Sequence, residues 1–501
     1  MNKVKIQIQR DFQIGEIDRQ MFGSFVEHMG SVVHNGIYEP GHPASDSSGI
    51  RRDVFDLVDD LKLSVIRYPG GNYSSNYDWE VTVGPVEKRP ATIDLAWRQI
   101  EPNTFGFDEF MRWISELGVD PIMTVNLGTK GIQDAVNLIE YTNFSKGTKY
   151  SDLRRTHGKE LPYGIKTWCL GNELDGQWQI ARKTAEEYGR LAAEAGKAMK
   201  IVDPEIKLVA VGSSATHLDS YPDWDLQVLK ETYEVADYIS LHHYINQNGD
   251  DLNTYLARAN DVEEQIVTII AACDYVKSLK RSKKTMMLSF DEWNIHRAPE
   301  VEYEPWTSGS PIDWCRFNML DTLVFGTMLI TLLRHADRIK IACQSLLINT
   351  IPLILTEKGG DAWPNPTYWI LQQASKYGRG TALSTVISSP EYLTEKYGKV
   401  PAVDHIAVLG ESGKEITVFL VNRSSEVMDT EIQVDGFIAP PCEASHTELH
   451  HPDLEAKNTG KKDINLKPEK SILNPKITGN KIECYMQPYS WNMVRLFIGE
   501  C

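Results

Sequence analysis

The stretch "YGIKTWCLGNELDG", residues 163–176, begins as an apolar run and ends in an amide and a carboxylate, Asn172 and Glu173. The apolar part has the length and composition of a buried strand. A surface loop would account for polar residues, but not for their position directly at the end of a buried strand. What Glu173 does therefore depends on whether a second carboxylate ends an equivalent strand elsewhere in the chain.

Seven more runs of this kind occur between residues 16 and 378, and helical patterns separate them. The eight predicted strands are 21–28, 63–71, 120–128, 163–173, 206–213, 238–244, 286–293 and 338–344, with helical patterns at 50–62, 107–118, 184–202 and 367–378. Near-continuous apolar strands, each followed by a helix, imply a parallel sheet covered on its faces. Eight such units predict an α/β fold with a closed (β/α)₈ TIM barrel over residues 16–378. The alternative is an open doubly wound sheet, but no G-x-G-x-x-G follows the first strand.

The pattern changes after Gly378. Short alternating strands separated by Gly, Pro, Asn and Lys replace the helical period, as in "KEITVFLVNRS" (414–424). Such strands predict an antiparallel, jelly-roll-like β-sandwich over residues 379–501. The opening "KVKIQIQ" (3–9) alternates in the same way, so we expect residues 1–15 to add a strand to this sandwich. The segment 457–470 is predicted to be a long solvated loop.

Composition excludes several classes of partner. A formal net charge of -17 in 501 residues argues against nucleic acid and anionic membranes, which require basic patches. The N-terminus lacks the apolar segment of a signal peptide, and no stretch approaches the roughly 18 apolar residues of a membrane span. Seven scattered cysteines form no C-x-x-C pair. These features predict a cytoplasmic protein with reduced thiols and a small or neutral ligand.

The ends of the predicted strands provide the candidate functional residues, because barrel enzymes place their chemistry at the C-terminal ends of the strands. Glu173 ends the fourth strand and Glu292 the seventh, so the two carboxylates are expected to face each other across the barrel mouth. Such a pair suits glycoside hydrolysis, in which one carboxyl donates a proton and the other stays ionised. Asp291 is expected to point away from Glu292, since successive strand residues alternate faces.

The pair His242-His243 raises the alternative of a metal site. Adjacent strand residues project to opposite faces, so both are unlikely ligands of one ion. His28 and His296 are also expected near the mouth, but no H-x-H or H-x-x-x-H spacing accompanies them. We therefore predict no metal and no cofactor.

The motifs together resemble the α-L-arabinofuranosidases of glycoside hydrolase family 51, a family of clan A. The resemblance rests on "MFGSFVEHMG" (21–30), "IRYPGGNY" (66–73), "WCLGNELDG" (168–176), "ISLHHY" (239–244) and "DEWN" (291–294), in this order. It implies that Glu173 is the general acid/base and Glu292 the nucleophile of a retaining, double-displacement reaction. The residues it implies for binding the furanose are Glu27, Asn72, Trp97, Asn172, Tyr244 and Gln344.

Further expectations follow from the resemblance. It implies an exo-acting enzyme that releases terminal L-arabinofuranose from arabino-oligosaccharides or from fragments of arabinoxylan or arabinan. It also implies no metal and a homo-oligomer, often a hexamer. For a retaining enzyme the two carboxyl groups should lie about 5 Å apart, and the ionised nucleophile should raise the pKa of the acid.

One segment departs from the family pattern. After "DEWN" the family usually continues with an aromatic pair, whereas this chain has "IHRAPEVEYEPWTSGSP" (295–311). This loop is expected to overhang the pocket and to affect the choice of leaving group. Trp306 either supplies the missing aromatic surface or anchors the loop by packing.

Two other functions stay open at this point. A β-xylosidase or an endoglucanase of the same clan would use the same two glutamates with a different sugar pocket. A non-catalytic carbohydrate-binding protein would have no use for two opposed carboxylates.

Overall fold

Eight parallel strands close into a barrel in the computed structural model, which describes residues 2–247 and 249–499 of the chain. The strands are β2 (Gly23–Phe25), β3 (Val65–Tyr68), β6 (Asp120–Thr124), β7 (Thr167–Cys169), β8 (Lys207–Ala210), β9 (Tyr238–Ile245), β10 (Met287–Ile295) and β11 (Ile339–Gln344). Each pairs in parallel with the next, and β11 pairs with β2 to close the ring. The predicted TIM barrel is confirmed, and the open sheet is excluded.

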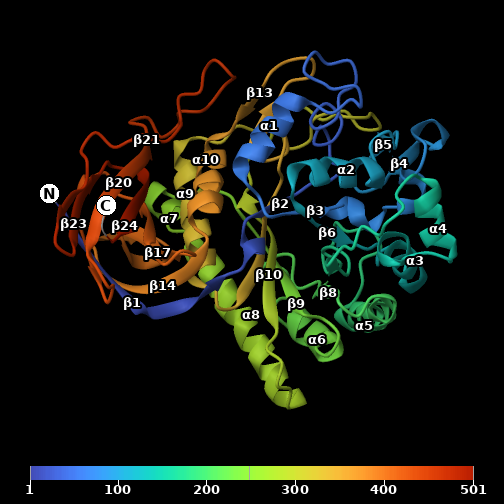
Figure 1. Ribbon diagram of the computed structural model, residues 1–501, viewed down its shortest axis with the longest axis horizontal. Coiled ribbons are helices and arrows are strands. Elements are labelled where there is room, and N and C mark those ends of the chain that lie inside the picture. Colours follow the sequence, from blue (N-terminus) through green and yellow to red (C-terminus); the bar gives the residue numbers. More distant parts are fainter. Residues whose placement is uncertain (1, 248, 500–501) are drawn as a thin grey trace.

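Helices follow the strands and surround the barrel (Figure 1). They are α1 (Arg52–Leu61), α2 (Phe107–Leu117), α3 (Ile132–Asn143), α4 (Lys149–Thr156), α5 (Ala185–Val202), α6 (Asp223–Thr232), α7 (Leu252–Leu256), α8 (Ala259–Lys280), α9 (Met319–Arg334) and α10 (Pro366–Tyr377). The start of α5 is a capping box: Glu187 N donates to Thr184 Oγ1, and Thr184 N donates to the Glu187 carboxylate. This cap fixes the end of the loop that begins at Glu173.

The second unit is a sheet of ten strands. Its strands are β1 (Asn2–Ile17), β14 (Gly380–Ser388), β17 (Val403–Gly410), β18 (Glu415–Asn422), β19 (Met428–Asp435), β20 (Pro441–His450), β21 (Glu469–Lys470), β22 (Lys476–Thr478), β23 (Lys481–Met486) and β24 (Ser490–Ile498). The two ends of the sheet approach each other, because β20 lies close to both β22 and β23. The sheet thus wraps around a core of its own, as expected for a jelly-roll-like sandwich.

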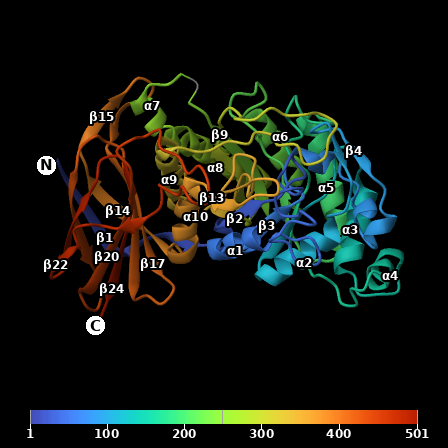
Figure 2. The same ribbon diagram turned by 90° about the horizontal axis from the view of Figure 1, so that it is seen from above.

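Strand β1 joins the N-terminus of the chain to this sheet. It lies between β14, with which it is antiparallel, and β19, with which it is parallel. Figure 2 shows β1 among the C-terminal strands. The parallel β1–β19 pair is the exception in a sheet whose other pairs are antiparallel.

Several short strands were not anticipated. They are β20, β21 and β22 of the large sheet and three two-stranded hairpins, β4 (Thr92–Asp94) with β5 (Gln99–Glu101), β12 (Ile354–Thr356) with β13 (Ala362–Pro364), and β15 (Glu391–Thr394) with β16 (Gly398–Pro401). They are short or rich in polar residues, so an apolar pattern does not detect them. The predicted loop 457–470 is irregular except at Glu469–Lys470.

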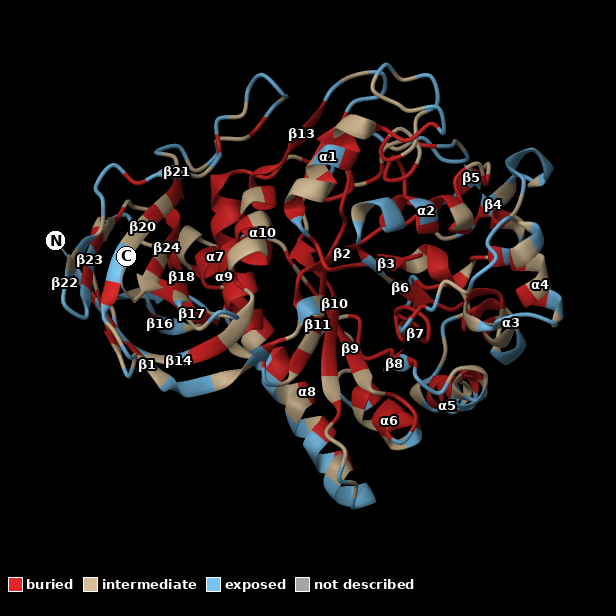
Figure 3. Ribbon diagram, in the orientation of Figure 1, coloured by how far each residue is buried: buried red, intermediate tan, exposed pale blue. Residues whose placement is uncertain are grey.

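Helix α9 is buried between the barrel and the sheet, and Figure 3 shows it as buried along most of its length. A helix that is apolar all round is normally buried on all sides, and α9 contacts β10 and β11 as well as β17, β18 and β24. Gly326 lets the indole of Trp491 approach, because a Cβ there would lie 2.7 Å from its ring. Among the described residues, no helix combines the length and apolar character needed to cross a bilayer.

The cysteines only partly follow the expectation of reduced thiols. Five of them are buried with free thiols: Cys169, Cys273, Cys315, Cys343 and Cys484. Cys442 is disulfide-bonded, which contradicts that expectation for this residue. Cys501 lies outside the described residues.

The packing of β1 leads to a test of the sheet. Ile6 is fully buried in the core of the sheet, whereas its neighbour Gln7 is exposed. We expect Ile6→Ala to lower the free energy of unfolding by about 2–5 kcal/mol, because it leaves a cavity. The matched Gln7→Ala should stay within about 0.5 kcal/mol of the wild type. Chemical unfolding measures both, and equal stability of the two variants would contradict the core position of β1.

Candidate active site

The two predicted carboxylates meet at the mouth of the barrel. Glu173 follows β7, Glu292 lies in β10, and both side chains are buried. One oxygen of each carboxylate and a ring nitrogen of His242 lie within 4.8 Å of one another. Glu173 has a φ of 46°, a left-handed conformation that is uncommon for a residue with a side chain. Such strain is often found at functional sites, where the surrounding structure holds it in place.

A cavity of about 160 Å³ opens beside these carboxylates. Six of the eight predicted site residues line it: Glu27, Asn72, Trp97, Glu173, Tyr244 and Glu292. The other lining residues are Phe25, Met29, Gly71, His296, Asp313, Leu346, Thr350 and Ile351. A void of roughly 150 Å³ is enough to hold one benzene molecule. The cavity therefore has the size for one small sugar ring rather than for a chain.

Glu27 is held by its neighbours on the wall of this cavity. Its Oε1 accepts from Tyr73 N at 2.9 Å and from the indole nitrogen of Trp97 at 2.6 Å. Gly71 makes room for the carboxylate, since a Cβ at this position would lie 1.9 Å from Glu27 Oε2. Gly71 also has a φ of 60°, and a Cβ on Gly70 would lie 2.1 Å from the ring of Phe25. Both glycines of "RYPGGN" are thus required, because Phe25 approaches Gly70 and Glu27 approaches Gly71 too closely for a Cβ atom.

The remaining two predicted residues, Asn172 and Gln344, are buried and do not line the cavity. Asn172 accepts from Arg67 and donates to Asn72 Oδ1 at 3.3 Å. Gln344 Oε1 accepts from Ser24 Oγ at 3.1 Å, while its amide nitrogen is buried without a partner. Asn172 thus contacts the pocket through Asn72, whereas Gln344 bonds a residue of the neighbouring strand β2.

Arg67 and His242 contact the two carboxylates. The strand-end analysis did not single out Arg67, and it considered His242 only as a candidate metal ligand. Arg67 donates to Glu292 Oε1 at 2.9 Å and is fully buried. His242 Nδ1 lies 2.8 Å from Glu173 Oε1 and 3.5 Å from Glu292 Oε2. Asp291 lies near both cations, 3.6 Å from Arg67 Nε and 3.4 Å from His242 Nε2. The sequence did contain a signal for this cluster. Arg67 lies inside an apolar strand run, and an arginine buried there needs an acidic partner.

The charges in this cluster shift the pKa values of its members. Burial raises the pKa of Glu173, and the Glu292 carboxylate raises it further, while hydrogen bonding to His242 lowers it. Burial lowers the pKa of His242, but the surrounding carboxylates, with Glu292 first, outweigh burial and raise that pKa well above its usual value. Glu173 can therefore keep its proton to a higher pH than an exposed glutamate, while His242 stays cationic between the two carboxylates.

Tyr244 and Trp178 bond the two carboxylates from the side of the cavity. The Tyr244 hydroxyl donates to Glu292 Oε2 at 2.8 Å. Trp178 donates from its indole nitrogen to Glu173 Oε2 at 2.7 Å, and 48% of this residue is exposed. Trp178 was missed because it ends no strand; it lies in the loop that continues "GNELDG".

The loop 295–311 lies against the hairpin that carries Trp97. Tyr303 donates from its hydroxyl to Arg98 O at 2.8 Å, and Trp306 N donates to Arg98 O at 2.5 Å. The Trp306 side chain is 48% exposed and does not line the cavity. The loop thus covers the outside of this hairpin, and its residue His296 reaches the cavity.

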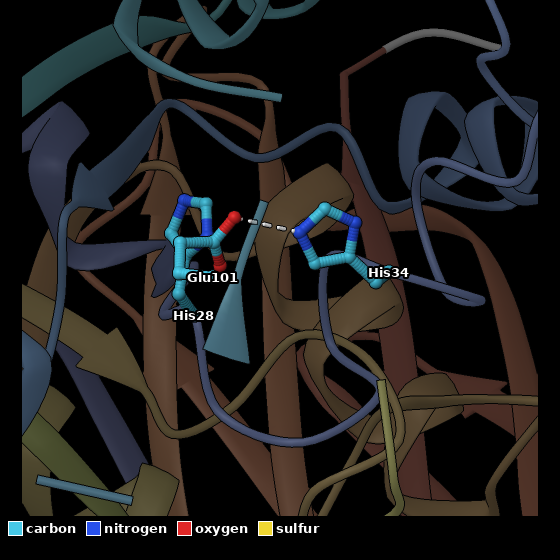
Figure 4. A group of neighbouring side chains, drawn as sticks. All are labelled: His28, His34 and Glu101. Carbon is cyan, nitrogen blue, oxygen red and sulfur yellow. Dashed lines mark hydrogen bonds and ion pairs between the residues drawn. The ribbon is translucent and has the colours of Figure 1, made fainter. Parts of the chain in front are cut away.

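A second buried cluster contains His28, His34 and Glu101 (Figure 4). Its residue types would suit a metal ion, but the spacing of their atoms does not. His28 Nδ1 lies 2.7 Å from Glu101 Oε2, the length of a charge-assisted hydrogen bond. Two ligands of a tetrahedral zinc ion would lie roughly 3.3 Å apart. The geometry favours a shared proton over a metal ion.

A larger cavity of about 1100 Å³ lies beside α2. It is lined by residues at the beginning of β6, such as Asp120 and Pro121, and by residues 156–159 after α4. It therefore opens toward the N-terminal ends of the strands, away from the two buried glutamates. The smaller cavity at the opposite end is the better candidate for catalysis.

Comparison with known proteins agrees with this geometry. The family model of the α-L-arabinofuranosidase 1 domain matches residues 57–284, and that of the α-L-arabinofuranosidase C-terminal domain matches residues 291–490. The chain belongs to the α-L-arabinofuranosidases of glycoside hydrolase family 51. The resemblance found in its motifs is confirmed.

Individual relatives resemble the chain over nearly its full length. An intracellular exo-α-(1→5)-L-arabinofuranosidase of Bacillus subtilis is 48% identical over 99% of both chains. An exo-α-(1→6)-L-arabinofuranosidase of Bifidobacterium longum is 40% identical over 99% of this chain and 98% of its own. The solved structure of a family 51 α-L-arabinofuranosidase from Bifidobacterium longum has a TM-score of 0.94 and 34% identity, covering 99% of this chain and all of that one.

The position of Gly71 gives a test of the pocket. We expect Gly71→Ala to lower kcat/KM on an arabinofuranoside by at least about 100-fold, because the new methyl group displaces the Glu27 carboxylate. Gly147→Ala is the matched control: its φ is 88°, yet nothing lies within 4 Å of the new Cβ. Equal losses of kcat/KM in both variants would show that backbone strain, and not the contact with Glu27, is responsible.

Proposed function

We propose that this member of family 51 is a retaining, exo-acting α-L-arabinofuranosidase in which Glu292 is the nucleophile and Glu173 the general acid/base. The observation that supports this most directly is the spacing of the carboxylates, whose nearest oxygens lie within 4.8 Å. Retaining glycosidases hold these groups about 5–5.5 Å apart, whereas inverting enzymes need a wider gap for water.

In the first step, Glu292 attacks the anomeric carbon while Glu173 donates its proton to the leaving oxygen. Arg67, His242 and Tyr244 orient the Glu292 carboxylate through contacts of 2.9, 3.5 and 2.8 Å. The raised pKa of Glu173 keeps its proton available to a higher pH than that of an exposed glutamate. The bond to the leaving group breaks as the glycosyl–enzyme ester forms.

In the second step, water hydrolyses that ester. Glycosylation removes the negative charge of Glu292, which was one cause of the raised pKa of Glu173. The pKa of Glu173 then falls, and its carboxylate accepts a proton from the attacking water. The change of role requires no movement of either residue.

The pocket suggests how the sugar is held. Glu27 and Asn72 offer oxygens and an amide to the hydroxyls of one furanose ring, and Trp97 offers an aromatic face. Asn172 bonds Asn72 and so supports the same wall, while Gln344 bonds Ser24 of β2. A cavity that holds one ring favours release of single terminal arabinose units.

We further propose that the substrates are short arabino-oligosaccharides inside the cell, with α-1,5 linkages as the first candidate. The support is the printed name of the Bacillus subtilis relative, an intracellular exo-α-(1→5)-L-arabinofuranosidase. The relative named for α-1,6 linkages shows that linkage varies among similar chains.

A homo-oligomer is proposed from the family resemblance alone. Residues 16–378 would be the catalytic unit, and residues 379–501 with strand 1–15 its structural partner.

The substrate class is tested with three nitrophenyl glycosides. We expect rapid release from 4-nitrophenyl α-L-arabinofuranoside and at least about 100-fold lower kcat/KM on the β-D-xylopyranoside and β-D-glucopyranoside. A sugar ring whose hydroxyls cannot bond Glu27 and Asn72 leaves these buried polar groups unpaired in the transition state. The loss of these hydrogen bonds lowers kcat/KM by about this factor. A preference for either pyranoside would favour the β-xylosidase or endoglucanase alternative.

The roles of the two glutamates are separated by the leaving group. Glu292→Ala should lose at least about 100-fold in kcat on every substrate, while Glu173→Ala should lose as much only where the leaving group needs a proton. We therefore expect Glu173→Ala to cleave a 2,4-dinitrophenyl arabinofuranoside far better than an arabino-oligosaccharide. Glu194→Ala, at an exposed glutamate on α5, is the control. Equal losses on both substrates would contradict the acid/base role.

The pKa shift predicts a pH profile. Glu173 must be protonated in the free enzyme, so kcat/KM on an oligosaccharide should fall as pH rises through its raised pKa. A retaining mechanism also requires an unprotonated nucleophile, so we expect a bell-shaped profile overall. With the dinitrophenyl substrate the alkaline limb should disappear. An alkaline limb of equal position on both substrates would assign it to another group.

A further inference from the structure

The hairpin of β4 and β5 is held on its inner side by one buried carboxylate. Glu101 ends the hairpin, and its Oε2 lies 2.7 Å from His28 Nδ1. Its Oε1 lies 2.9 Å from His34 Nε2 and accepts from Asn103 N at 2.9 Å. Both oxygens are thus bonded, and Figure 4 shows the carboxylate between the two imidazoles. A carboxylate bonded on both oxygens cannot rotate freely.

The same hairpin carries Trp97 of the sugar pocket. Trp97 lies between the two strands, and its indole nitrogen donates to Glu27 Oε1 at 2.6 Å. His28, which follows Glu27 in sequence, bonds the hairpin twice: through Glu101 and through its own carbonyl oxygen, which accepts from Gln99 Nε2 at 3.1 Å. The two consecutive residues 27 and 28 therefore both contact this hairpin.

Burial makes the cluster unusually dependent on its partners. Burial alone would raise the pKa of Glu101, but His34 and His28 outweigh it and lower that pKa far below its usual value. His28 is further fixed by Tyr68, whose hydroxyl lies 2.9 Å from its Nε2, and by stacking on Tyr73 at 4.8 Å. Removing one imidazole or the charge would leave a buried polar group unpaired, which the hairpin could relieve only by shifting.

The outer side of the hairpin is bonded to the loop 295–311. Thr307 O accepts from Ile100 N at 3.4 Å, and Arg98 O accepts from the Tyr303 hydroxyl at 2.8 Å. Arg98 itself has a φ of 51°, so the turn that follows Trp97 is strained. The hairpin is therefore fixed from two sides, by the Glu101 cluster within and by this loop outside.

We infer that Glu101, His28 and His34 form a positioning clamp, which holds Trp97 in hydrogen-bonding distance of Glu27 and thereby shapes the sugar pocket. The inference rests on the proposed function, because the pocket must bind an arabinofuranosyl group. The three residues act through Trp97 and do not line the cavity themselves.

The test is a double-mutant cycle of Glu101→Gln with Trp97→Phe. Glutamine has one acceptor oxygen and no charge, so it cannot accept hydrogen bonds from both imidazoles through separate carboxylate oxygens as Glu101 does. We expect Glu101→Gln to lower kcat/KM on 4-nitrophenyl α-L-arabinofuranoside by about tenfold or more, mainly through KM. In the Trp97→Phe background the same change should lower it less than about twofold, because coupled residues are not additive. Independent, multiplying effects would overturn the clamp.

A matched control separates positioning from loss of stability. Asp404 is also a buried carboxylate with a cationic partner, Arg334, but it lies in the sheet domain. Asp404→Asn should lower the unfolding midpoint, as Glu101→Gln does, and leave kcat/KM within about twofold of the wild type. If both variants lose kcat/KM equally, the Glu101 cluster has only a structural role.

Milder variants keep the test decisive if Glu101→Gln does not fold. His34→Gln retains a donor toward Glu101 and should keep most of the kcat/KM, whereas His34→Leu should lose it through KM. Equal activity of the two would overturn the clamp. The clamp would also be overturned if the purified wild type contained one equivalent of zinc and Glu101→Gln contained none, since the cluster would then be a metal site. Absence of wild-type turnover would overturn both the clamp and the proposed function, whereas unaffected variants of an active wild type would overturn the clamp alone.

Discussion

The site depends on placing two carboxylates within 4.8 Å of each other in a region from which water is largely excluded. Like charges so close resist joint ionisation, and burial alone would neutralise both. The structure opposes this with two buried cations, Arg67 and His242, which contact the carboxylates at 2.9 and 2.8 Å. The result is asymmetric: Arg67 and Tyr244 both donate to Glu292, whereas the pKa of Glu173 is raised. This asymmetry supports the proposed roles of Glu292 as nucleophile and Glu173 as acid.

The backbone around these charged groups adopts conformations and close contacts that place their side chains. Glu173 adopts a left-handed conformation in the loop that follows β7, and the capping box of α5 fixes the far end of the same loop. Gly71 occupies space that a methyl group would take from the Glu27 carboxylate. These constraints are local, but they are satisfied only because β3, β7 and β10 come together in the closed barrel.

Electrostatics also connect the pocket to segments remote from it in sequence. The Glu101 cluster joins residues 28 and 34 to the β4–β5 hairpin, and the loop 295–311 covers the same hairpin from outside. The wall that contains Trp97 is thus built from three separate parts of the chain. The sheet domain has its own core and packs on the barrel through α9.

Much of this protein is determined by its sequence alone. Strand periodicity located all eight barrel strands, and Glu173 and Glu292 were found because strand ends of a barrel converge by geometry. The motifs identified the family and six residues that line the cavity. What only the tertiary structure decided are pairings between distant residues: Arg67 with Glu292, His242 between two carboxylates, Gln344 with Ser24, and the clamp at Glu101. A periodic pattern records which face of an element is apolar, but a buried polar contact depends on which elements become neighbours and on the distance between their side chains.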